Sequence, residues 1–240
     1  MIATFTALLF AHVLADFLLQ TDWLVANKRK PQVLLLHGLI VLVTLQLALG
    51  SVTAWPLLAL AAAHLVIDAI KTFATGNSGI RPFLWDQAAH LATLVVTAVL
   101  FPTLWATGAW AAFAWLPGLM ALVAGYLLCV RAGGFVIGLL MVPWAQTELP
   151  KGLENGGYLI GILERSLIFL LVLVGQPTGV GFLIAAKSVL RFDTTARDQT
   201  AGEYVIIGTL ASFGWALLTA YATVMLMDAL PPLGFLPQRP

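Results

Sequence analysis

The sequence of 240 residues is poor in charge and contains a single cysteine. Only 10% of its residues are charged, with twelve Lys and Arg against eleven Asp and Glu, so it offers no basic face for nucleic acid and no acidic tail for a cationic partner. Cys129 alone excludes an internal disulfide and a cysteine-rich zinc or iron–sulfur site. The first residues lack the basic n-region of a signal peptide, and we expect a retained first membrane span.

Hydrophobic residues make up 60% of the chain, and the mean hydropathy of +0.96 excludes an ordinary soluble domain. This composition predicts an all-α, polytopic bundle of transmembrane helices. Because a crossing needs about 20 apolar residues, the apolar runs predict about eight spans, at residues 2–23, 33–50, 56–74, 83–101, 116–143, 156–174, 179–191 and 203–227. The seventh run is short for a full crossing, and the fifth is long enough to tilt or to break near Arg131 and Gly133.

The basic residues of the loops follow the positive-inside rule. When Lys28, Arg29 and Lys30 are placed in the cytoplasm, every later basic loop falls on the same side of the membrane. Those later loops contain Lys71, Arg81, Lys151, Arg191 and Arg197. We therefore expect both termini to lie outside the cytoplasm.

All four histidines lie in the first ninety residues, and three of them have an aspartate one helical turn away. The pairs are His12 with Asp16, His64 with Asp68, and His90 with Asp86. Counted from the cytoplasmic helix ends, these histidines lie about eight to ten residues deep and the aspartates about four to six, with His37 between the two levels. Without partners in hydrocarbon, such groups would cost several kcal/mol each. The pattern indicates a bound metal ion.

The segment around the first pair is repeated along the chain. Residues 11–16, AHVLAD, are similar to residues 63–68, AHLVID, and each copy is followed by a basic loop, a proline and a helix with another histidine. Because both copies enter from the same side, the repeat predicts two halves related by an axis along the membrane normal. We expect residues 1–101 to form a four-helix, metal-binding half, and residues 102–240 a distal half that packs against it within one membrane-embedded domain.

Four imidazoles and three carboxylates suit a divalent metal, zinc first, with iron or manganese as alternatives, and suffice for one ion or a bridged pair. The expected ligands are His12, Asp16, His37, His64, Asp68, Asp86 and His90. A metal that keeps a water ligand lowers the pKa of that water to about 7, and the three aspartates are candidates for the catalytic base. Because the site lies toward the cytoplasmic leaflet, we expect a metal-dependent hydrolase of a lipid or amphiphilic substrate.

The distal half contains a second set of charged residues at similar depth. These residues are Glu164, Arg165, Lys187, Arg191 and Glu203. The set predicts a substrate site in which the cations bind a phosphate or carboxylate. The alternative is that Glu164, Arg165, Lys187 and Glu203 neutralise one another and hold the distal helices together.

The segments HVLADFLLQTDW, HLVIDAIK and DQAAH resemble an uncharacterised family of bacterial membrane proteins, domain of unknown function 3307. The resemblance covers about the first hundred residues. The segments GGYLIGILERSLIFLLVLVGQ, GFLIAAKSVLRF and EYVIIGTL are similar to the distal region of longer members. The resemblance implies a membrane location and no particular activity. We expect the bacterial inner membrane, with membrane lipids as partners, no nucleic acid and the oligomeric state left open.

Three other functions use the same His and Asp residues. The first is a proton- or divalent-cation-coupled transporter or channel, although the outer halves of the first four helices contain no further histidine or carboxylate for a continuous ion path. The second is a di-iron-type membrane oxygenase, which zinc would exclude because zinc has no redox chemistry. The third is a structural subunit whose site stabilises a partner interface.

Overall fold

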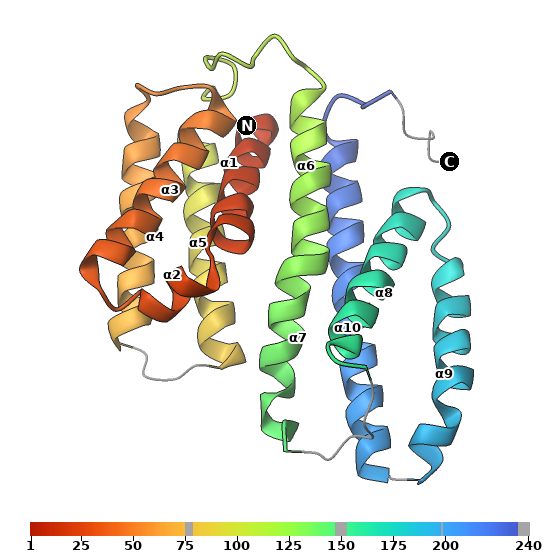
Figure 1. Cartoon of the computed structure of the whole chain (residues 1–240). Coiled ribbons are helices and arrows are strands. Elements are labelled where there is room, and N and C mark those ends of the chain that lie inside the picture. The colour runs from red at the N-terminus through yellow and green to blue at the C-terminus, as the bar shows by residue number, and fades with distance from the viewer. Residues whose placement is uncertain (75–78, 147–152, 198, 235–240) are drawn as a thin grey trace. The chain divides into compact units, whose positions relative to one another are not determined.

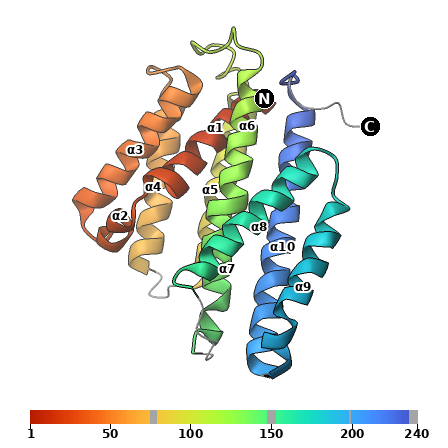
Figure 2. The ribbon, with the colours of Figure 1, turned by 45° about the vertical axis from the view of Figure 1, so that its right-hand side comes forward.

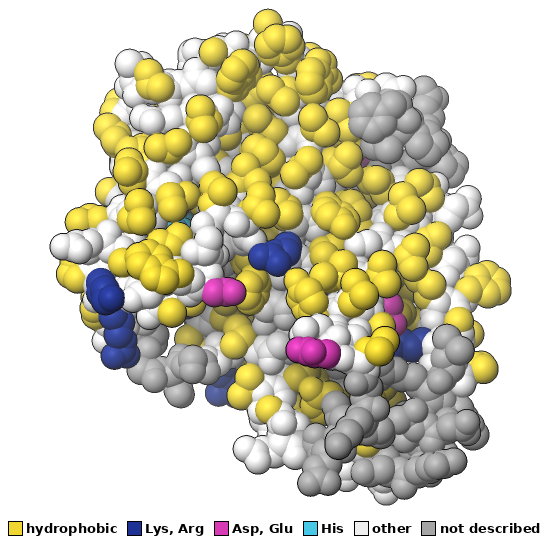
Figure 3. Space-filling view, viewed as in Figure 1, with side chains coloured by type: hydrophobic (Ala, Val, Ile, Leu, Met, Phe, Trp, Pro, Cys, Tyr) yellow, Lys and Arg dark blue, Asp and Glu magenta, His cyan; other side chains and the backbone are white. Residues whose placement is uncertain are grey.

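The structure is a computed structural model that describes residues 1–74, 79–146, 153–197 and 199–234, without the side chains of residues 190–197. Every regular element in these ranges is helical (Figure 1). Among the described residues, seven helices are long and apolar enough to cross a membrane. Hydrophobic side chains are spread widely over the face in Figure 3, and charged groups are few. The chain is therefore a multi-pass membrane protein, as the composition predicts.

Backbone contacts divide the chain into two compact units. The first unit is Met1–Leu127 with Met225–Leu233, and the second includes Leu128–Val224. The first contains α1 (Ile2–Leu14), the π-helical turn η1 (Ala15–Leu19), α2 (Asp22–Asn27), α3 (Pro31–Leu49), α4 (Trp55–Ala74), α5 (Ile80–Leu100) and α6 (Leu116–Leu127). From Leu128 onward follow the π-helical turn η2 (Leu128–Ala132), α7 (Gly133–Met141), η3 (Val142–Trp144), α8 (Gly156–Leu173), α9 (Gly179–Arg197) and α10 (Gln199–Asp228).

The first predicted span ends earlier than expected. Helix α1 continues into η1, and Gln20 then leaves the helical conformation with φ −77° and ψ 92°. Thr21 begins the short helix α2, where its hydroxyl accepts a hydrogen bond from the Leu24 backbone N–H at 3.4 Å. The span is therefore Ile2–Leu19 rather than 2–23. Helix α3 starts with Pro31 in its first turn and ends at Gly50, whose φ of 63° is left-handed.

Two predicted spans of unusual length have distinct structures. The fifth is the continuous apolar segment Leu116–Trp144. A π-helical turn at Leu128–Ala132 widens the helix where the sequence predicts a break, and the chain stays helical on both sides. The seventh corresponds to the apolar part of α9, Gly179–Val189, which is shorter than the seven candidate spans.

The first unit is divided along its length into an apolar end and a polar end. Helix α1 packs against α3, α5 and α6, and α4 packs against α3 and α5 (Figures 1 and 2). The apolar end contains the buried core residues Leu8, Leu45, Leu57 and Leu94. These come from the first part of α1 and α4 and the last part of α3 and α5. The opposite parts of the same four helices, next to the basic loops, carry the histidines and aspartates.

Candidate metal centre

The first unit brings together all seven predicted ligands, called the His/Asp cluster below. Helix α1 carries His12, η1 carries Asp16, α3 carries His37, α4 carries His64 and Asp68, and α5 carries Asp86 and His90. Every one of these side chains is more than nine-tenths buried. The His64 and His90 rings stack with centroids 3.9 Å apart, and the His12 ring lies 5.6 and 5.2 Å from them. Four helices therefore present their polar groups to one small volume.

Four of these side chains form the tightest part of the cluster, the four-ligand group: Asp16, His37, His64 and Asp68. The Nε2 atoms of His37 and His64 are 3.3 Å apart. Asp16 Oδ1 lies 3.3 Å from the first and 3.4 Å from the second. Asp68 Oδ2 lies 3.3 Å and 3.6 Å from the same two nitrogens. Two ligands at about 2.0–2.1 Å from a tetrahedral zinc ion are about 3.3–3.4 Å apart, so these five separations are close to those of atoms on one ion. The ligand atoms of Asp16, His37 and His64 all lie within 4.8 Å of one another.

The other oxygen of Asp68 faces a second set, the Asp86 group: Asp68, Asp86 and His90. Asp68 Oδ1 lies 3.9 Å and Asp86 Oδ1 lies 3.5 Å from His90 Nε2. The ligand atoms of this set all lie within 4.8 Å of one another, as do ring nitrogens of His12, His64 and His90. Asp68 thus connects two adjacent sets of metal-ligand atoms through its two carboxylate oxygens.

Unsatisfied polar atoms are concentrated at this place. In the described part of the chain, the buried side-chain atoms of the cluster that have no hydrogen-bond partner are His12 Nδ1, Asp16 Oδ1, His37 Nδ1, Asp68 Oδ2, Asp86 Oδ1, and both ring nitrogens of His90. A buried donor or acceptor without a partner costs about 1–3 kcal/mol. Carboxylate oxygens and imidazole nitrogens are the ligand types of zinc. The residues present therefore fit a metal ion.

Two lysines that the sequence analysis assigned to the cytoplasmic loops contact the cluster. Lys28 Nζ lies 2.8 Å from Asp68 Oδ1. Lys71 Nζ lies 2.6 Å from Asp86 Oδ2. Three carboxylates thus face two ammonium groups, and with neutral imidazoles the cluster carries one net negative charge, which a divalent cation would reverse. Lys71 lies three residues after Asp68 on α4, a spacing that would pair it with Asp68, whereas the structure pairs it with Asp86 of α5.

Two glutamine side chains also contact the histidines. Gln20 Nε2 lies 3.1 Å from His37 Nε2, and Gln87 Oε1 lies 3.4 Å from His12 Nε2. The Gln20 contact is to the same His37 nitrogen that faces Asp16 and Asp68, so an ion on that nitrogen would replace this contact. A polar group such as Gln87 on one ring nitrogen of His12 fixes the orientation of that ring. Neither glutamine is among the site residues predicted from the sequence. Gln20 continues the four-residue spacing of His12 and Asp16, so the same pattern could have identified it.

Asp16 lies in η1, the π-helical turn that ends the first span. A π turn pairs each N–H with the carbonyl five residues earlier, and such turns occur frequently at functional sites. Here the turn carries the aspartate that faces both His37 and His64. The local departure from α-helical geometry therefore coincides with the four-ligand group.

The charged residues predicted as a substrate site in the distal half have separate contacts. Lys187 forms an ion pair with Glu164 at 2.7 Å. Arg165 is buried and donates hydrogen bonds to Ser212 Oγ and the Val130 carbonyl, both at 3.2 Å. Glu203 accepts a hydrogen bond from Gln199 at 3.0 Å, and the side chain of Arg191 lies outside the described residues. These contacts all lie within the second unit.

Residues 4–115 match the family described as Protein of unknown function (DUF3307). This part of the chain is similar to the DUF3307 family. The matched range contains all seven residues of the His/Asp cluster, as well as Lys28 and Lys71, so the candidate metal centre lies wholly within the matched segment. The match confirms the resemblance of the first hundred residues to this family. Comparison with curated proteins and with solved structures finds no match for the chain.

Proposed function

We propose that the protein is a membrane-embedded metal-dependent enzyme whose divalent ion, zinc in the first instance, is held by the four-ligand group. The observation that carries this proposal is the set of 3.3 to 3.6 Å separations between His37 and His64 nitrogens and the facing Asp16 and Asp68 oxygens. The Asp86 group lies beside it and shares Asp68, so the centre takes one or two ions. Iron and manganese are the alternative metals.

The reaction that we propose is hydrolysis of a lipid or amphiphilic substrate. A metal ion in such a site supplies Lewis acidity and a bound water with a pKa of about 7. Asp16 and Asp68 face the imidazole nitrogens and serve as ligands. Asp86 has one oxygen without a hydrogen-bond partner and also lines a pocket, so it is the carboxylate placed to accept a proton from water at the substrate.

The apolar end of the first unit favours an enzyme over a transporter. Beyond the cluster, the core of α1, α3, α4 and α5 consists of apolar side chains such as Leu8, Leu45 and Leu94. The hydroxyl of Thr4 donates to the Pro102 carbonyl, and that of Thr44 donates to backbone carbonyls of its own helix. Among the described residues of the apolar end, no histidine or carboxylate extends the His/Asp cluster toward the opposite side of the membrane. An ion path would need such groups.

We further propose that the protein lies in the inner membrane of a bacterium, with the basic loops in the cytoplasm and both termini outside. Lys28, Arg29 and Lys30 follow the first span, and Lys71 and Arg81 flank the loop between α4 and α5. The positive-inside rule places such loops in the cytoplasm. The His/Asp cluster then lies nearer to the cytoplasmic leaflet, where lipid head groups and water can reach it.

Elemental analysis of the detergent-purified protein tests the proposal. We expect one or two equivalents of zinc, iron or manganese in the wild type, and loss of metal in His64→Gln and in Asp68→Asn. Asp22→Asn is the matched control, because Asp22 is an exposed carboxylate on α2 outside the cluster, and it should keep the metal. A folded wild type without metal, or variants that keep all of it, would refute the metalloenzyme.

A further inference from the structure

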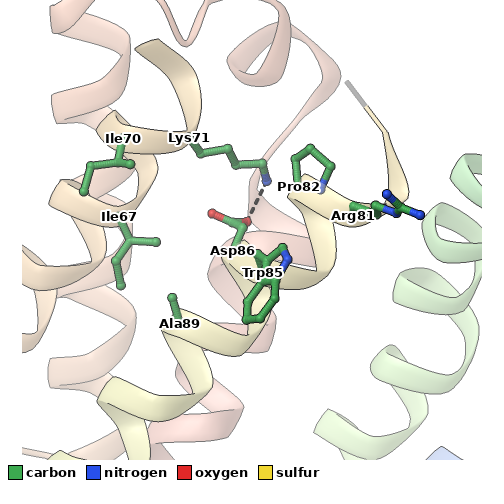
Figure 4. A pocket seen from close by; sticks show the side chains of 8 residues that line it. All are labelled: Ile67, Ile70, Lys71, Arg81, Pro82, Trp85, Asp86 and Ala89. Carbon is green, nitrogen blue, oxygen red and sulfur yellow. Dashed lines mark hydrogen bonds and ion pairs between the residues drawn. The ribbon is translucent and has the colours of Figure 1, made fainter. Parts of the chain in front are cut away.

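A pocket of about 570 Å³ lies beside the His/Asp cluster, between α4 and α5 (Figure 4). This volume is within the range of about 300–1,000 Å³ that is usual for small-molecule sites. Both helices are candidate membrane spans, and Ile70 and Trp85 of the lining are more than half exposed, so we expect the pocket to open toward lipid. The pocket can therefore be reached by a molecule that diffuses within the membrane.

The walls of the pocket are apolar. Ile67 and Ile70 of α4 lie on one side, and Trp85 and Ala89 of α5 lie on the other (Figure 4). Trp85 is 78% exposed and Ile70 is 58% exposed. In a membrane-spanning segment such surfaces contact hydrocarbon, so the walls suit an acyl chain.

The polar part of the pocket carries more positive than negative charge. Lys71 and Arg81 line it together with Asp86, and Figure 4 shows Lys71 directed at Asp86, with Arg81 beyond Pro82. The Lys71–Asp86 ion pair is neutral as a whole, which leaves the charge of Arg81 uncompensated by the pocket lining. Basic side chains beside an apolar wall match a lipid that has a negatively charged phosphate.

One carboxylate links the pocket to the candidate metal centre. Asp86 Oδ2 accepts a hydrogen bond from Lys71 at 2.6 Å, and Asp86 Oδ1 lies 3.5 Å from His90 Nε2. A phosphate bound at Lys71 would therefore lie next to a residue of the cluster. Only the side chain of Asp86 would separate such a phosphate from His90.

We propose that this pocket binds an anionic phospholipid, with its acyl chain between α4 and α5 and its phosphate at Lys71 and Arg81. That this phospholipid is the substrate of the candidate centre rests on the proposed function. Its binding in the pocket requires no metal. The apolar walls distinguish a lipid from free phosphate, which would contact only the cationic end.

Native mass spectrometry of the full chain in detergent tests the pocket. The probes are phosphatidylglycerol and phosphatidylcholine with identical acyl chains, and we expect tighter binding of phosphatidylglycerol. Arg81→Gln should reduce this preference about fivefold, the effect of one basic residue on an anionic head group. The matched control is Lys30→Gln, because Lys30 is an exposed cation of the same basic side that does not line the pocket. A third variant, Ala89→Trp, fills the pocket and should weaken binding of both lipids.

Equal binding of the two lipids by the wild type, or equal effects of Arg81→Gln and Lys30→Gln, would overturn the proposal. Millimolar inorganic phosphate should leave the bound lipid in place, and displacement would identify a free-phosphate site instead. Metal content measured on the same samples separates the two proposals. Protein that keeps its metal but does not discriminate the lipids refutes the pocket alone, and metal-free protein that does discriminate refutes the metalloenzyme alone.

Discussion

Asp16→Asn is expected to change stability in opposite directions with and without a divalent ion. The side chain of Asp16 is 7% exposed, and its Oδ1 faces His37 and His64 nitrogens without a hydrogen bond. In metal-stripped protein, the amide introduced by the substitution can donate to one of these nitrogens. Because an unsatisfied buried acceptor costs about 1–3 kcal/mol, the free energy of unfolding of the stripped protein should rise by an amount in that range.

With metal present, the same substitution removes one of four ligands. An ion at a hundred times its dissociation constant stabilises the folded state by about 2.7 kcal/mol. For a chain of this size each kcal/mol raises the Tm by about 2–4 °C, so zinc should raise the Tm of the wild type by about 5–11 °C. Asp16→Asn should lose most of this increase.

The assay is thermal unfolding in detergent, followed by tryptophan fluorescence, of protein treated with a chelator and then supplied with zinc. Asp22→Asn, an exposed carboxylate of α2, serves as control and should behave as the wild type under both conditions. A wild type whose Tm does not respond to zinc would refute the reasoning. So would an Asp16→Asn variant that is less stable in both conditions, since that is the behaviour of a carboxylate that serves only as a structural hydrogen-bond acceptor.

Three further predictions concern two packing contacts and one ion pair. Leu8→Ala should lower the free energy of unfolding by about 3–5 kcal/mol, measured by denaturant titration, because Leu8 is fully buried in the apolar end; a loss below 1 kcal/mol would contradict this packing. Gly108→Ala should cost about 1–3 kcal/mol in the same titration, because its Cβ would lie 1.9 Å from the Leu49 carbonyl oxygen, and an unchanged midpoint would count against this close contact. Lys187→Met should destabilise more than the double variant Lys187→Met, Glu164→Gln, because the single change leaves a mostly buried carboxylate without its partner; additive effects in the double-mutant cycle would argue against the pair.

The spacing of the histidines and aspartates was sufficient to predict that they share a site. Residues four apart lie on the same face of a helix, so His12 and Asp16 point together whatever their neighbours. The sequence does not specify which helices meet. The contacts of His37 with Asp16 and Asp68 depend on how α1, α3 and α4 pack, and only the structure provides that arrangement.

The sequence does not predict the cationic contacts or the π turn, for physical reasons. The positive-inside rule assigns a lysine to a loop from its position alone, whereas the long side chains of Lys28 and Lys71 reach back to aspartates in the spans. Helix η1 differs from an α-helix by the shift of backbone hydrogen bonds, which no residue type in Ala15–Leu19 specifies. The apolar run therefore predicted a longer regular span than the structure has.

Asp68 makes the insertion of α4 into the membrane depend on the helices synthesised before it. An aspartate at the centre of a span raises the free energy of insertion by about 2.5–3.5 kcal/mol, and Asp68, six residues from the end of α4, carries part of this cost. The partner Lys28 precedes Asp68 in the chain, and Lys71 precedes Asp86, so during synthesis each of these two carboxylates follows its lysine. In this order α4 and α5 enter the membrane after the lysine that pairs with their aspartate, whereas Asp16 enters with the first span, before either lysine. A rearranged chain with α4 ahead of α2 would expose Asp68 to lipid before Lys28 existed.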